Sequence, residues 1–253
     1  MTELASQGGL FAAWLAVAAL VFVVLLFLPA PYGRHARAGW GPVIPARPGW
    51  ILMEIPAVLV VAVLFAASGR TREPVAIAFL LLWELHYVQR ALVYPFRARH
   101  SARGMPLAVA AMGFLFNVVN GALLGTSLFL GEPVRGAAWL GEPRFLAGTA
   151  LFLGGMALNW SADATLRRLR RPGSADYGIP RGGPFELVSC PNYLGEIVEW
   201  AGWALATWSP AGLAFALWTA ANLVPRALAH HRWYRERFPG YPARRRAIVP
   251  FLL

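Results

Sequence analysis

Lysine is absent from the sequence, and all 23 residues counted as Lys or Arg are arginines. This absence excludes catalysis through a lysine nucleophile or a lysine Schiff base. Cysteine is nearly absent as well, because Cys190 is the only one. A single cysteine forms no internal disulfide and builds no cysteine-based metal site. The adjacent His230 and His231 cannot face the same way on a helix and have no third ligand nearby in sequence, so we expect no metal.

Two signatures of phosphate binding are also missing. The sequence contains no G-x-G-x-x-G fingerprint and no Walker loop, which argues against a dinucleotide-binding Rossmann domain and a P-loop enzyme. Acidic residues are scarce, with 12 against 23 arginines, and the formal net charge is +11. This excess does not indicate nucleic-acid binding, because the arginines lie between apolar segments rather than along one polar face.

Long hydrophobic runs are abundant. Hydrophobic residues make up 58% of the chain, the mean hydropathy is +0.51, and 11 residues are tryptophan, as expected for aromatic belts at both membrane interfaces. We predict an all-α, polytopic membrane protein that forms a single domain over residues 1–253. Ser209–Gly212 is predicted to form a tight turn between the last two helices. The seven expected transmembrane helices lie near residues 10–28, 50–67, 75–94, 107–130, 145–166, 189–208 and 213–234.

The arginines also predict the orientation of the chain. With the N-terminus outside, 18 arginines fall in the inner segments and four in the outer segments. Positive residues accumulate on the cytoplasmic side of membrane proteins, so we expect the C-terminus in the cytoplasm. No arginine precedes the first helix, which is therefore expected to be retained rather than removed as a signal peptide. The expected location is the bacterial inner membrane or, in a eukaryote, the endoplasmic reticulum.

Polar residues recur along one face at the inner end of several helices. Residues three or four positions apart lie on the same side of a helix, so each set is able to line one surface. Polar groups in a membrane helix are costly unless they face the interior of the bundle or a water-filled cavity. The sequence therefore predicts a polar pocket among the helices, open to the cytoplasm. The sets are Glu54; Tyr87, Arg90 and Tyr94; Asn159, Asp163 and Arg170; Asn192, Glu196 and Glu199; and Arg226, His230 and Tyr234.

These sets also have purely structural interpretations. Glu54 alone fits an acid at the membrane interface, and Asn159 with Asp163 fits a polar contact between two helices. Asn117 and Asn120 are expected to serve packing. As a binding site, the arginines suit phosphates, the carboxylates suit ribose hydroxyls and the amides suit a carboxamide, a combination that fits a dinucleotide. A transporter of an anionic solute would use the inner arginines in the same way.

Longer motifs make the chain similar to a known family. The motifs are Trp50-x-x-x-Glu54-x-Pro56, Leu85-His86-Tyr87-x-x-Arg90-x-x-x-Tyr94, Asn159-x-x-x-Asp163, Tyr177-x-Ile179-Pro180, Asn192-Tyr193-Leu194-Gly195-Glu196 and, in the last part, His230-His231-Arg232-x-Tyr234. With these motifs the chain resembles, essentially end to end, the steroid 5α-reductase family (3-oxo-5α-steroid 4-dehydrogenases) and is similar to its bacterial-type members.

The resemblance implies a membrane reductase that uses NADPH and a steroid whose 3-oxo group is conjugated to the 4,5 double bond. It implies that helices one to four mainly hold the steroid, and that helices five to seven and the C-terminal tail mainly hold the cofactor. By the same resemblance, Trp50, Glu54 and Tyr87 bind the substrate, and the last two are the catalytic pair that holds the 3-oxo oxygen. The implied cofactor-binding residues are Asn159, Asp163, Arg170, Tyr177, Asn192, Glu196, Arg226, His230 and Tyr234, with Arg97 or Arg103 at the phosphates.

The implied chemistry agrees with the nature of the residues. Hydride addition to C5 places negative charge on the 3-oxo oxygen, which needs hydrogen-bond donors already directed at it. Tyr87 has an O–H, and Glu54 donates only in its protonated form, which an apolar setting favours. We expect a hydrophobic steroid from the bilayer and membrane lipids as partners, no nucleic acid, and a monomer. The alternatives are a related sterol or enoyl reductase, a membrane methyltransferase that uses S-adenosylmethionine, and a lipid transporter without catalysis.

Overall fold

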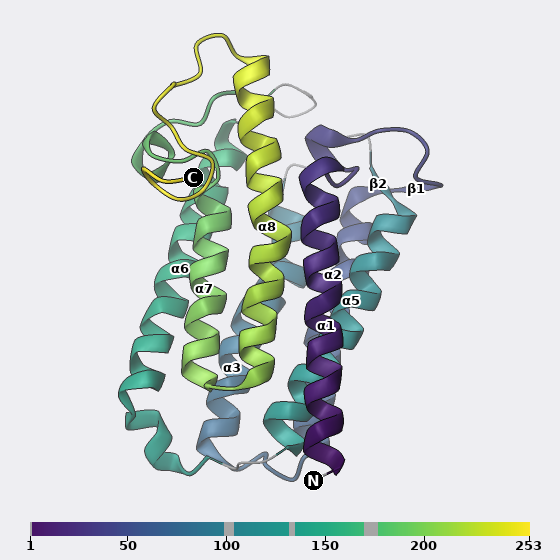
Figure 1. The fold of residues 1–253 in the computed structure, drawn as a ribbon, viewed down its shortest axis with the longest axis vertical. Coiled ribbons are helices and arrows are strands. Elements are labelled where there is room, and N and C mark those ends of the chain that lie inside the picture. Colours follow the sequence, from purple (N-terminus) through teal and green to yellow (C-terminus); the bar gives the residue numbers. More distant parts are fainter. Residues whose placement is uncertain (1, 99–103, 132–134, 170–176) are drawn as a thin grey trace. The chain divides into compact units, whose positions relative to one another are not determined.

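The computed structural model describes residues 2–98, 104–131, 135–169 and 177–253. In these ranges the chain is mainly helical (Figure 1). It divides into two compact units. One unit contains α1, nearly all of α6, α7, α8 and the C-terminal segment. The other contains the elements between residues 31 and 146. The first predicted helix therefore belongs with the fifth, sixth and seventh, whereas the second, third and fourth form a unit of their own.

The helices predicted from the hydrophobic runs are confirmed as helices, with ends mostly close to those expected, although α1 begins at Thr2 rather than near Leu10. They are α1 (Thr2–Phe27), α2 (Ala46–Ala67), α3 (Pro74–Val88), α5 (Leu107–Gly125), α6 (Pro143–Leu169), α7 (Pro191–Thr207) and α8 (Pro210–Arg237). A π-helix, η2 (Gln89–Val93), and the short α4 (Tyr94–Arg97) continue α3, and a second π-helix, η3 (Thr126–Leu130), continues α5. Shorter elements are the 3-10 helices η1 (Gly33–His35), η4 (Ala137–Gly141) and η5 (Gly183–Glu186) and the antiparallel strands β1 (Val43–Ile44) and β2 (Met105–Pro106).

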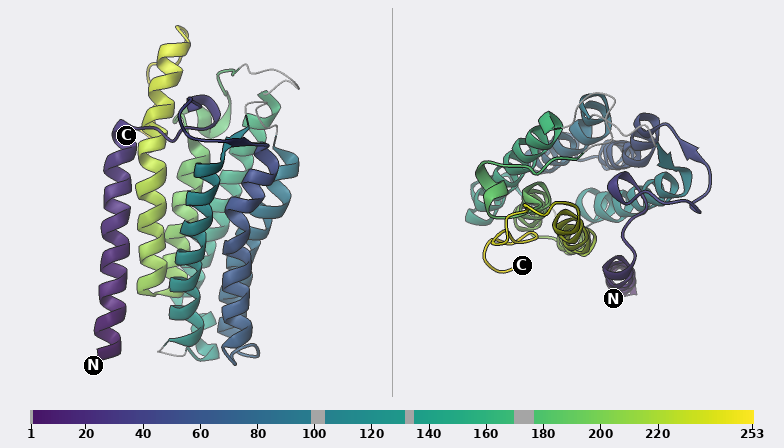
Figure 2. Two further views of the ribbon diagram at one scale, coloured as in Figure 1. Left: turned by 90° about the vertical axis from the view of Figure 1, so that its right-hand side faces the viewer. Right: turned by 90° about the horizontal axis from the view of Figure 1, so that it is seen from above.

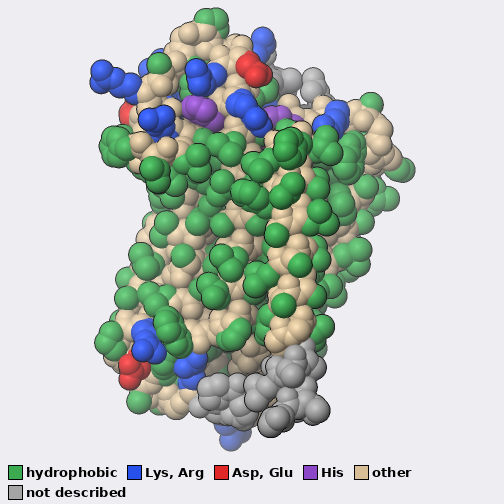
Figure 3. Space-filling view, in the orientation of Figure 1, with side chains coloured by type: hydrophobic (Ala, Val, Ile, Leu, Met, Phe, Trp, Pro, Cys, Tyr) green, Lys and Arg blue, Asp and Glu red, His purple; other side chains and the backbone are tan. Residues whose placement is uncertain are grey.

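Several of the helices have the length and composition of membrane spans. Five helical stretches of the described chain qualify: Gly8–Phe27, Ala46–Ala67, Pro74–Arg97, Leu107–Leu130 and Pro143–Leu169. The chain is thus a multi-pass membrane protein, with hydrophobic side chains along its helices and arginines near helix ends (Figure 3). α7 has only 17 residues, and the second half of α8 is rich in arginine and histidine. A total of seven spans and a cytoplasmic C-terminus stay predictions.

In the unit of residues 31–146, α2 and α5 pack closely because small residues line α5. Gly113, Gly121 and Gly125 lie at multiples of four positions, and a methyl group added to any of them would meet side chains of α2. Small residues of this kind let membrane helices approach each other. Asn117 completes the stripe, and its Nδ2 donates to the Met53 carbonyl over 2.7 Å. The close packing therefore places an amide group against the backbone of α2.

In the other unit, α6 and α7 touch along their backbones. Gly148 and Gly155 of α6 lie seven residues apart, as do Gly195 and Gly202 of α7, so each pair recurs on one helix face. A methyl group on any of the four would collide with backbone atoms of the facing helix, and on Gly195 it would lie 2.6 Å from the Asn159 nitrogen. The two helices therefore lie in direct contact, as at the small-residue interfaces of membrane bundles.

Aromatic side chains join α1, α6, α7 and α8. α1 runs beside α8 (Figure 2). Trp14 of α1 and Trp218 of α8 have ring centres 5.0 Å apart, and the Trp218 indole N–H donates to the Trp14 carbonyl over 3.0 Å. Trp200 of α7 lies edge-on to Phe215 of α8 at 4.5 Å and to Phe152 of α6 at 5.9 Å. These contacts fill the core of the unit and hold α8 between α1 and α7.

The reversal between α7 and α8 is shorter than the predicted turn over Ser209–Gly212. Trp208 adopts a left-handed conformation, with φ of 44° and ψ of 49°, and ends α7. The Ser209 Oγ accepts from the Gly212 amide over 3.0 Å and caps α8, whose first residue is Pro210. The prediction that Pro210–Gly212 belong to the turn was wrong. A proline at the first helical position loses no hydrogen bond and already has a helical φ.

We expect Ser209→Ala to lower the free energy of unfolding by about 1 kcal/mol, because it removes the hydroxyl that caps α8. The melting temperature of the purified protein in lipid nanodiscs measures this loss. Ser161→Ala is the matched control, since the Ser161 hydroxyl is exposed and donates only to the local Leu158 carbonyl. Equal melting temperatures for the two variants would contradict a stabilising cap at Ser209.

Candidate functional site

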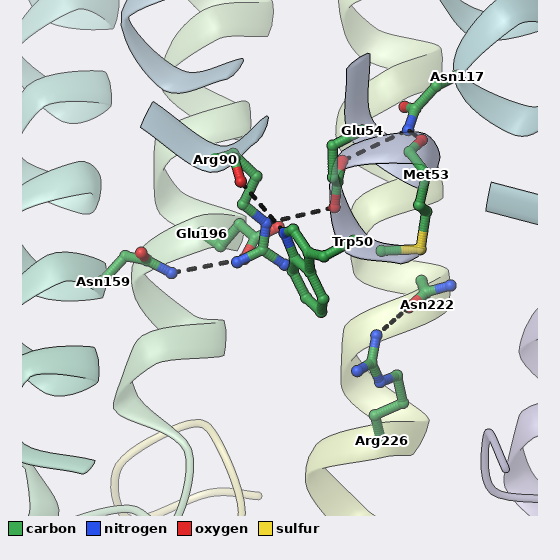
Figure 4. A network of polar contacts seen from close by, with 9 residues as sticks. All are labelled: Trp50, Met53, Glu54, Arg90, Asn117, Asn159, Glu196, Asn222 and Arg226. Carbon is green, nitrogen blue, oxygen red and sulfur yellow. Dashed lines mark hydrogen bonds and ion pairs between the residues drawn. The ribbon is translucent and has the colours of Figure 1, made fainter. Parts of the chain in front are cut away.

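The buried carboxylate of Glu54 is the centre of a polar cluster in the unit of α2, α3 and α5 (Figure 4). Its Oε1 lies 3.5 Å from Nε of Arg90, and its Oε2 accepts from Nδ2 of Asn117 over 3.4 Å. A charge that is only 8% exposed is costly unless an opposite charge and hydrogen bonds compensate it. Both are present, because Arg90 supplies the opposite charge and Asn117 supplies a hydrogen bond.

A π-helix brings Arg90 to this cluster. η2 begins at Gln89, directly after α3, and π-helical turns of this kind occur frequently at functional sites. The Arg90 carbonyl accepts from the Trp50 indole N–H over 3.1 Å. The Arg90 guanidinium lies over the rings of Trp50, at 4.7 Å, and Tyr94, at 5.3 Å. These cation–π contacts and the ion pair with Glu54 together orient the Arg90 side chain.

Tyr87 is positioned by the packing of α3 on α2, which run antiparallel. The Trp83 indole N–H donates to the Ala57 carbonyl over 2.9 Å and marks where the two helices meet. One turn further along α3 comes Tyr87, and one turn back along α2 come Met53 and Glu54. Tyr87 is buried, with its ring 4.5 Å from that of Trp83. The two predicted catalytic residues therefore occupy neighbouring positions along the α2–α3 interface.

A second polar cluster joins α6 and α7. Asn159 Nδ2 donates to the Asn192 carbonyl over 3.0 Å and to Glu196 Oε2 over 3.4 Å. Asn192 Nδ2 donates to Asp163 Oδ1 over 3.1 Å. These contacts are possible because the contact at Gly155, one turn before Asn159, brings the two backbones together. Two amides and two carboxylates, predicted from separate motifs, thus form one hydrogen-bonded group.

α8 contributes a third group, which surrounds Tyr193 at the start of α7. The Tyr193 hydroxyl lies 3.1 Å from Nε2 of His230, and the Arg226 guanidinium lies 5.4 Å from the centre of the Tyr193 ring. Arg226 NH1 donates to Asn222 Oδ1 over 3.1 Å. Arg226 and His230 therefore share one face of α8, which is turned toward the first turn of α7.

The remaining predicted cofactor residues lie outside these groups. Tyr234 is buried, and its ring stacks on that of Tyr241 in the C-terminal segment, with centres 5.2 Å apart. Tyr177 packs edge-on against Trp233, with ring centres 5.1 Å apart. Both tyrosines thus belong to an aromatic group at the end of α8. The other predicted contributors are Arg97, which ends α4, and two arginines outside the described residues, Arg103 and Arg170.

Two polar partners in these clusters were not among the predicted site residues. Asn117 contacts Glu54, and Asn222 contacts Arg226. The spacing of Asn117 within the glycine stripe of α5 is a signal that it faces the neighbouring helix, since residues four apart share a helix face. Asn222 lies one turn before Arg226, which is the corresponding signal on α8.

The fold and these clusters define a class, a helical multi-pass membrane protein with amide and charged groups buried between its helices. Comparison with known proteins then identifies the family. The protein-family model described as 3-oxo-5-alpha-steroid 4-dehydrogenase matches residues 103–253 of the chain. The chain belongs to this family, and the resemblance carried by its motifs is confirmed.

Similar proteins occur in plants and mammals. "Steroid 5-alpha-reductase DET2" of Arabidopsis thaliana is 40% identical over 237 residues, which cover 91% of this chain and 90% of the relative. "3-oxo-5-alpha-steroid 4-dehydrogenase 1" of Bos taurus is 42% identical over 244 residues, which cover 94% and 93%. The protein of the same name from Homo sapiens is 42% identical over 224 residues, which cover 87% and 85%. The similarity therefore extends over most of the chain and includes both units.

Proposed function

We propose that the protein is an NADPH-dependent oxidoreductase that reduces the 4,5 double bond of 3-oxo-4-ene steroids to give 5α-dihydro-3-oxosteroids. Relatives at 40–42% identity are named as steroid 5-alpha-reductases and 3-oxo-5-alpha-steroid 4-dehydrogenases, which supports this reaction. The observation that carries the proposal is the hydrogen-bonded group of Asn159, Asp163, Asn192 and Glu196 between α6 and α7. Polar and charged side chains are costly between membrane helices, so such a group is not expected in a purely apolar helix interface.

The donors and acceptors of this unit fit a nicotinamide dinucleotide. The carboxylates of Asp163 and Glu196 are acceptors for ribose hydroxyls, the side-chain amides suit a carboxamide, and the Arg226 guanidinium suits a phosphate. The hydrogen bond from Asn192 to Asp163 orients both side chains in advance, which lowers the entropic cost of binding. When bound, NADPH supplies the hydride that reduces C5 of the steroid.

In this proposal Tyr87 and Glu54 hold the 3-oxo oxygen of the steroid. The Tyr87 hydroxyl donates a hydrogen bond to that oxygen as it gains negative charge. Glu54 faces the Arg90 guanidinium and donates only after it has taken up a proton. In its ionised form it keeps Arg90, and the positive charge of Arg90, in place. Trp50, which contacts both Arg90 and Tyr94, offers an aromatic surface to the steroid rings.

We further propose that the steroid arrives through the bilayer and that the protein acts as a monomer in the bacterial inner membrane or, in a eukaryote, in the endoplasmic reticulum. Exposed hydrophobic side chains cover α1 and α5, and they give a lipid-dissolved substrate and the surrounding lipids a compatible surface. Steroids carry little charge, so their supply from the membrane requires no polar channel across the outer half of the helices.

Turnover by the purified protein tests the proposed function. In lipid nanodiscs with NADPH and a 3-oxo-4-ene steroid, we expect the absorbance of the reduced nicotinamide to fall and a product that contains two more hydrogens than the substrate. A 3-oxo steroid already saturated between C4 and C5 is the matched control, and it should consume no cofactor. Absence of turnover with the unsaturated steroid across several lipids and detergents would refute the proposal.

A further inference from the structure

A buried hydrogen-bonded hub lies outside the clusters described above, where the start of α7, the end of α8 and the C-terminal segment meet. Its centre is Ser189, whose hydroxyl lies 2.6 Å from Nδ1 of His231 and 2.6 Å from the hydroxyl of Tyr241. Ser189 is only 3% exposed, so these contacts are shielded from solvent. The proposed reaction gives no role to this hub, which comprises Ser189, His231, Tyr241 and Arg245.

Backbone hydrogen bonds run beside the hub. The Ser189 amide donates to the Arg246 carbonyl over 2.8 Å, and the Arg246 amide donates to the Leu187 carbonyl over 2.9 Å. The Cys190 amide donates to the Ala247 carbonyl over 3.1 Å. α7 begins directly after Cys190 and has no side-chain cap of its own. The C-terminal segment therefore fixes the direction in which the chain enters α7.

Arg245 holds the other end of the hub, although it is only 1% exposed. Its NH1 donates to the Pro180 carbonyl over 3.0 Å and to the Tyr241 hydroxyl over 3.5 Å. Its NH2 lies 3.9 Å from the Glu186 carboxylate. A buried guanidinium is costly unless it is paired in this way, and the pairing is lost if the C-terminal segment moves. Arg245 therefore resists displacement of that segment.

Arg245 fixes the direction of the first hydrogen bonds in the hub. Arg245 only donates, so the Tyr241 hydroxyl accepts from it and donates its own proton to Ser189. Burial raises the pKa of Tyr241, which keeps that proton in place. The Ser189 hydroxyl donates to the Arg246 carbonyl over 3.1 Å and lies 2.6 Å from Nδ1 of His231, where the tautomer of the imidazole sets which group donates. Burial, followed by the charge of nearby arginines, lowers the pKa of His231 and so favours the neutral imidazole.

Two contacts link the hub to residues of the proposed cofactor site. The Tyr241 ring stacks on that of Tyr234, with centres 5.2 Å apart and planes 9° apart. His231 directly follows His230, whose Nε2 lies 3.1 Å from the Tyr193 hydroxyl. If the C-terminal segment moves, both the start of α7 and the end of α8 therefore move with it.

We propose that the hub positions the cofactor site. Through Tyr241 and Arg245, the C-terminal segment holds the first turn of α7, and this turn carries Asn192 and leads to Glu196. The members of the hub act as positioning residues, because their effect reaches the site through Asn192, three residues after Ser189. This inference rests on the proposed function, because the effect that the inference predicts is a change in the affinity for NADPH.

The affinity of the full-length protein for NADPH tests this inference. Tyr241→Phe removes one hydroxyl and keeps the ring that stacks on Tyr234. In lipid nanodiscs, with the fluorescence of the reduced nicotinamide as the signal, we expect Kd to rise about fivefold, which corresponds to the loss of the short hydrogen bond to Ser189. We expect kcat at saturating NADPH to stay unchanged. Ser209→Ala, at the opposite end of the α7–α8 hairpin, is the control that lowers the melting temperature and leaves Kd as it is.

The pH dependence gives a second readout, which a loss of packing does not produce. His231 is faced by Arg235 on its own helix and by Tyr241, Arg245 and Arg246 on the C-terminal segment. Because its pKa is lowered in the hub, docking of the segment is fully favoured above the ordinary value of about 6.5 and weakens as the pH falls below it. We expect Kd to rise more steeply below that pH in the wild type than in His231→Asn, whose side-chain amide donates and accepts hydrogen bonds but does not titrate.

The outcomes separate this inference from the proposed function. If the wild type binds and oxidises NADPH while Tyr241→Phe and His231→Asn keep its Kd at every pH, the hub has no positioning role and the proposed function stands. If the wild type neither binds nor oxidises NADPH, both are overturned. A raised Kd for Tyr241→Phe but not for Ser209→Ala, together with a flatter pH profile for His231→Asn, supports the positioning role. If Tyr241→Phe fails to fold, the pH dependence of Kd in His231→Asn tests the positioning role.

Discussion

Tyr87→Phe is expected to lower kcat about 100-fold while it changes the affinity for NADPH little. The substitution removes one hydrogen-bond donor to the 3-oxo oxygen of the steroid. It keeps the ring, which packs against Trp83 at 4.5 Å and against His86 at 4.9 Å, so the melting temperature should hardly change. Initial rates at varied concentrations of steroid and NADPH separate the effect on kcat from the effects on the two KM values.

Asp163→Asn is the contrasting variant, and its effect should fall on the cofactor. The Asp163 carboxylate accepts from Asn192 over 3.1 Å within the α6–α7 cluster. We expect the KM for NADPH to rise about tenfold, as for the loss of a hydrogen bond to a charged group, with kcat at saturation largely kept. Loss of NADPH binding in Tyr87→Phe, together with normal binding in Asp163→Asn, would show that the roles of the two clusters are assigned the wrong way round.

Gly155→Ala is expected to lower the free energy of unfolding by about 2 kcal/mol, because the added methyl group collides with the backbone of α7 at Gly195 and Glu199. The two helices must move apart to accept it. Asn159 lies one turn after Gly155, so the same movement lengthens its hydrogen bond to the Asn192 carbonyl. We therefore expect a lower melting temperature together with a higher Kd for NADPH.

Gly154→Ala is the matched control for this variant. Gly154 precedes Gly155 in the same helix, and a methyl group added there meets no atom within 4 Å. Alanine is favoured over glycine inside a helix, by roughly 0.5–1 kcal/mol, so this variant should be slightly more stable than the wild type. Changes of the same sign in the two variants would contradict the backbone contact between α6 and α7.

Hydropathy and helical spacing were sufficient to predict the helices and the helix faces that carry the polar groups of the site. The apolar run from residue 107 to residue 130 is occupied by α5 and η3, because a helix satisfies every backbone hydrogen bond within an apolar segment. Asn159 and Asp163, one turn apart on α6, do face Asn192 and Glu196, one turn apart on α7. Their spacing of four positions places each pair on one helix face, whatever the rest of the fold does.

The same reasoning was less complete where the helix is not a regular α-helix. Tyr87, Arg90 and Tyr94 were predicted as one stripe of an unbroken helix, whereas η2 interrupts it at Gln89. The π-helix directs the Arg90 carbonyl to the Trp50 indole, a contact that regular spacing does not predict.

The sequence by itself determined the apolar helices, the face of each helix that carries polar groups, and the family, because these depend on local periodicity and on continuous motifs. Only the tertiary structure decided that Asn117 donates to Glu54, that Asn159 meets Asn192, and that the C-terminal segment closes on Ser189. These contacts join residues 33 to 63 positions apart. No local rule sets the partner of such a group, because the partner depends on how closely two backbones approach and on which faces they present.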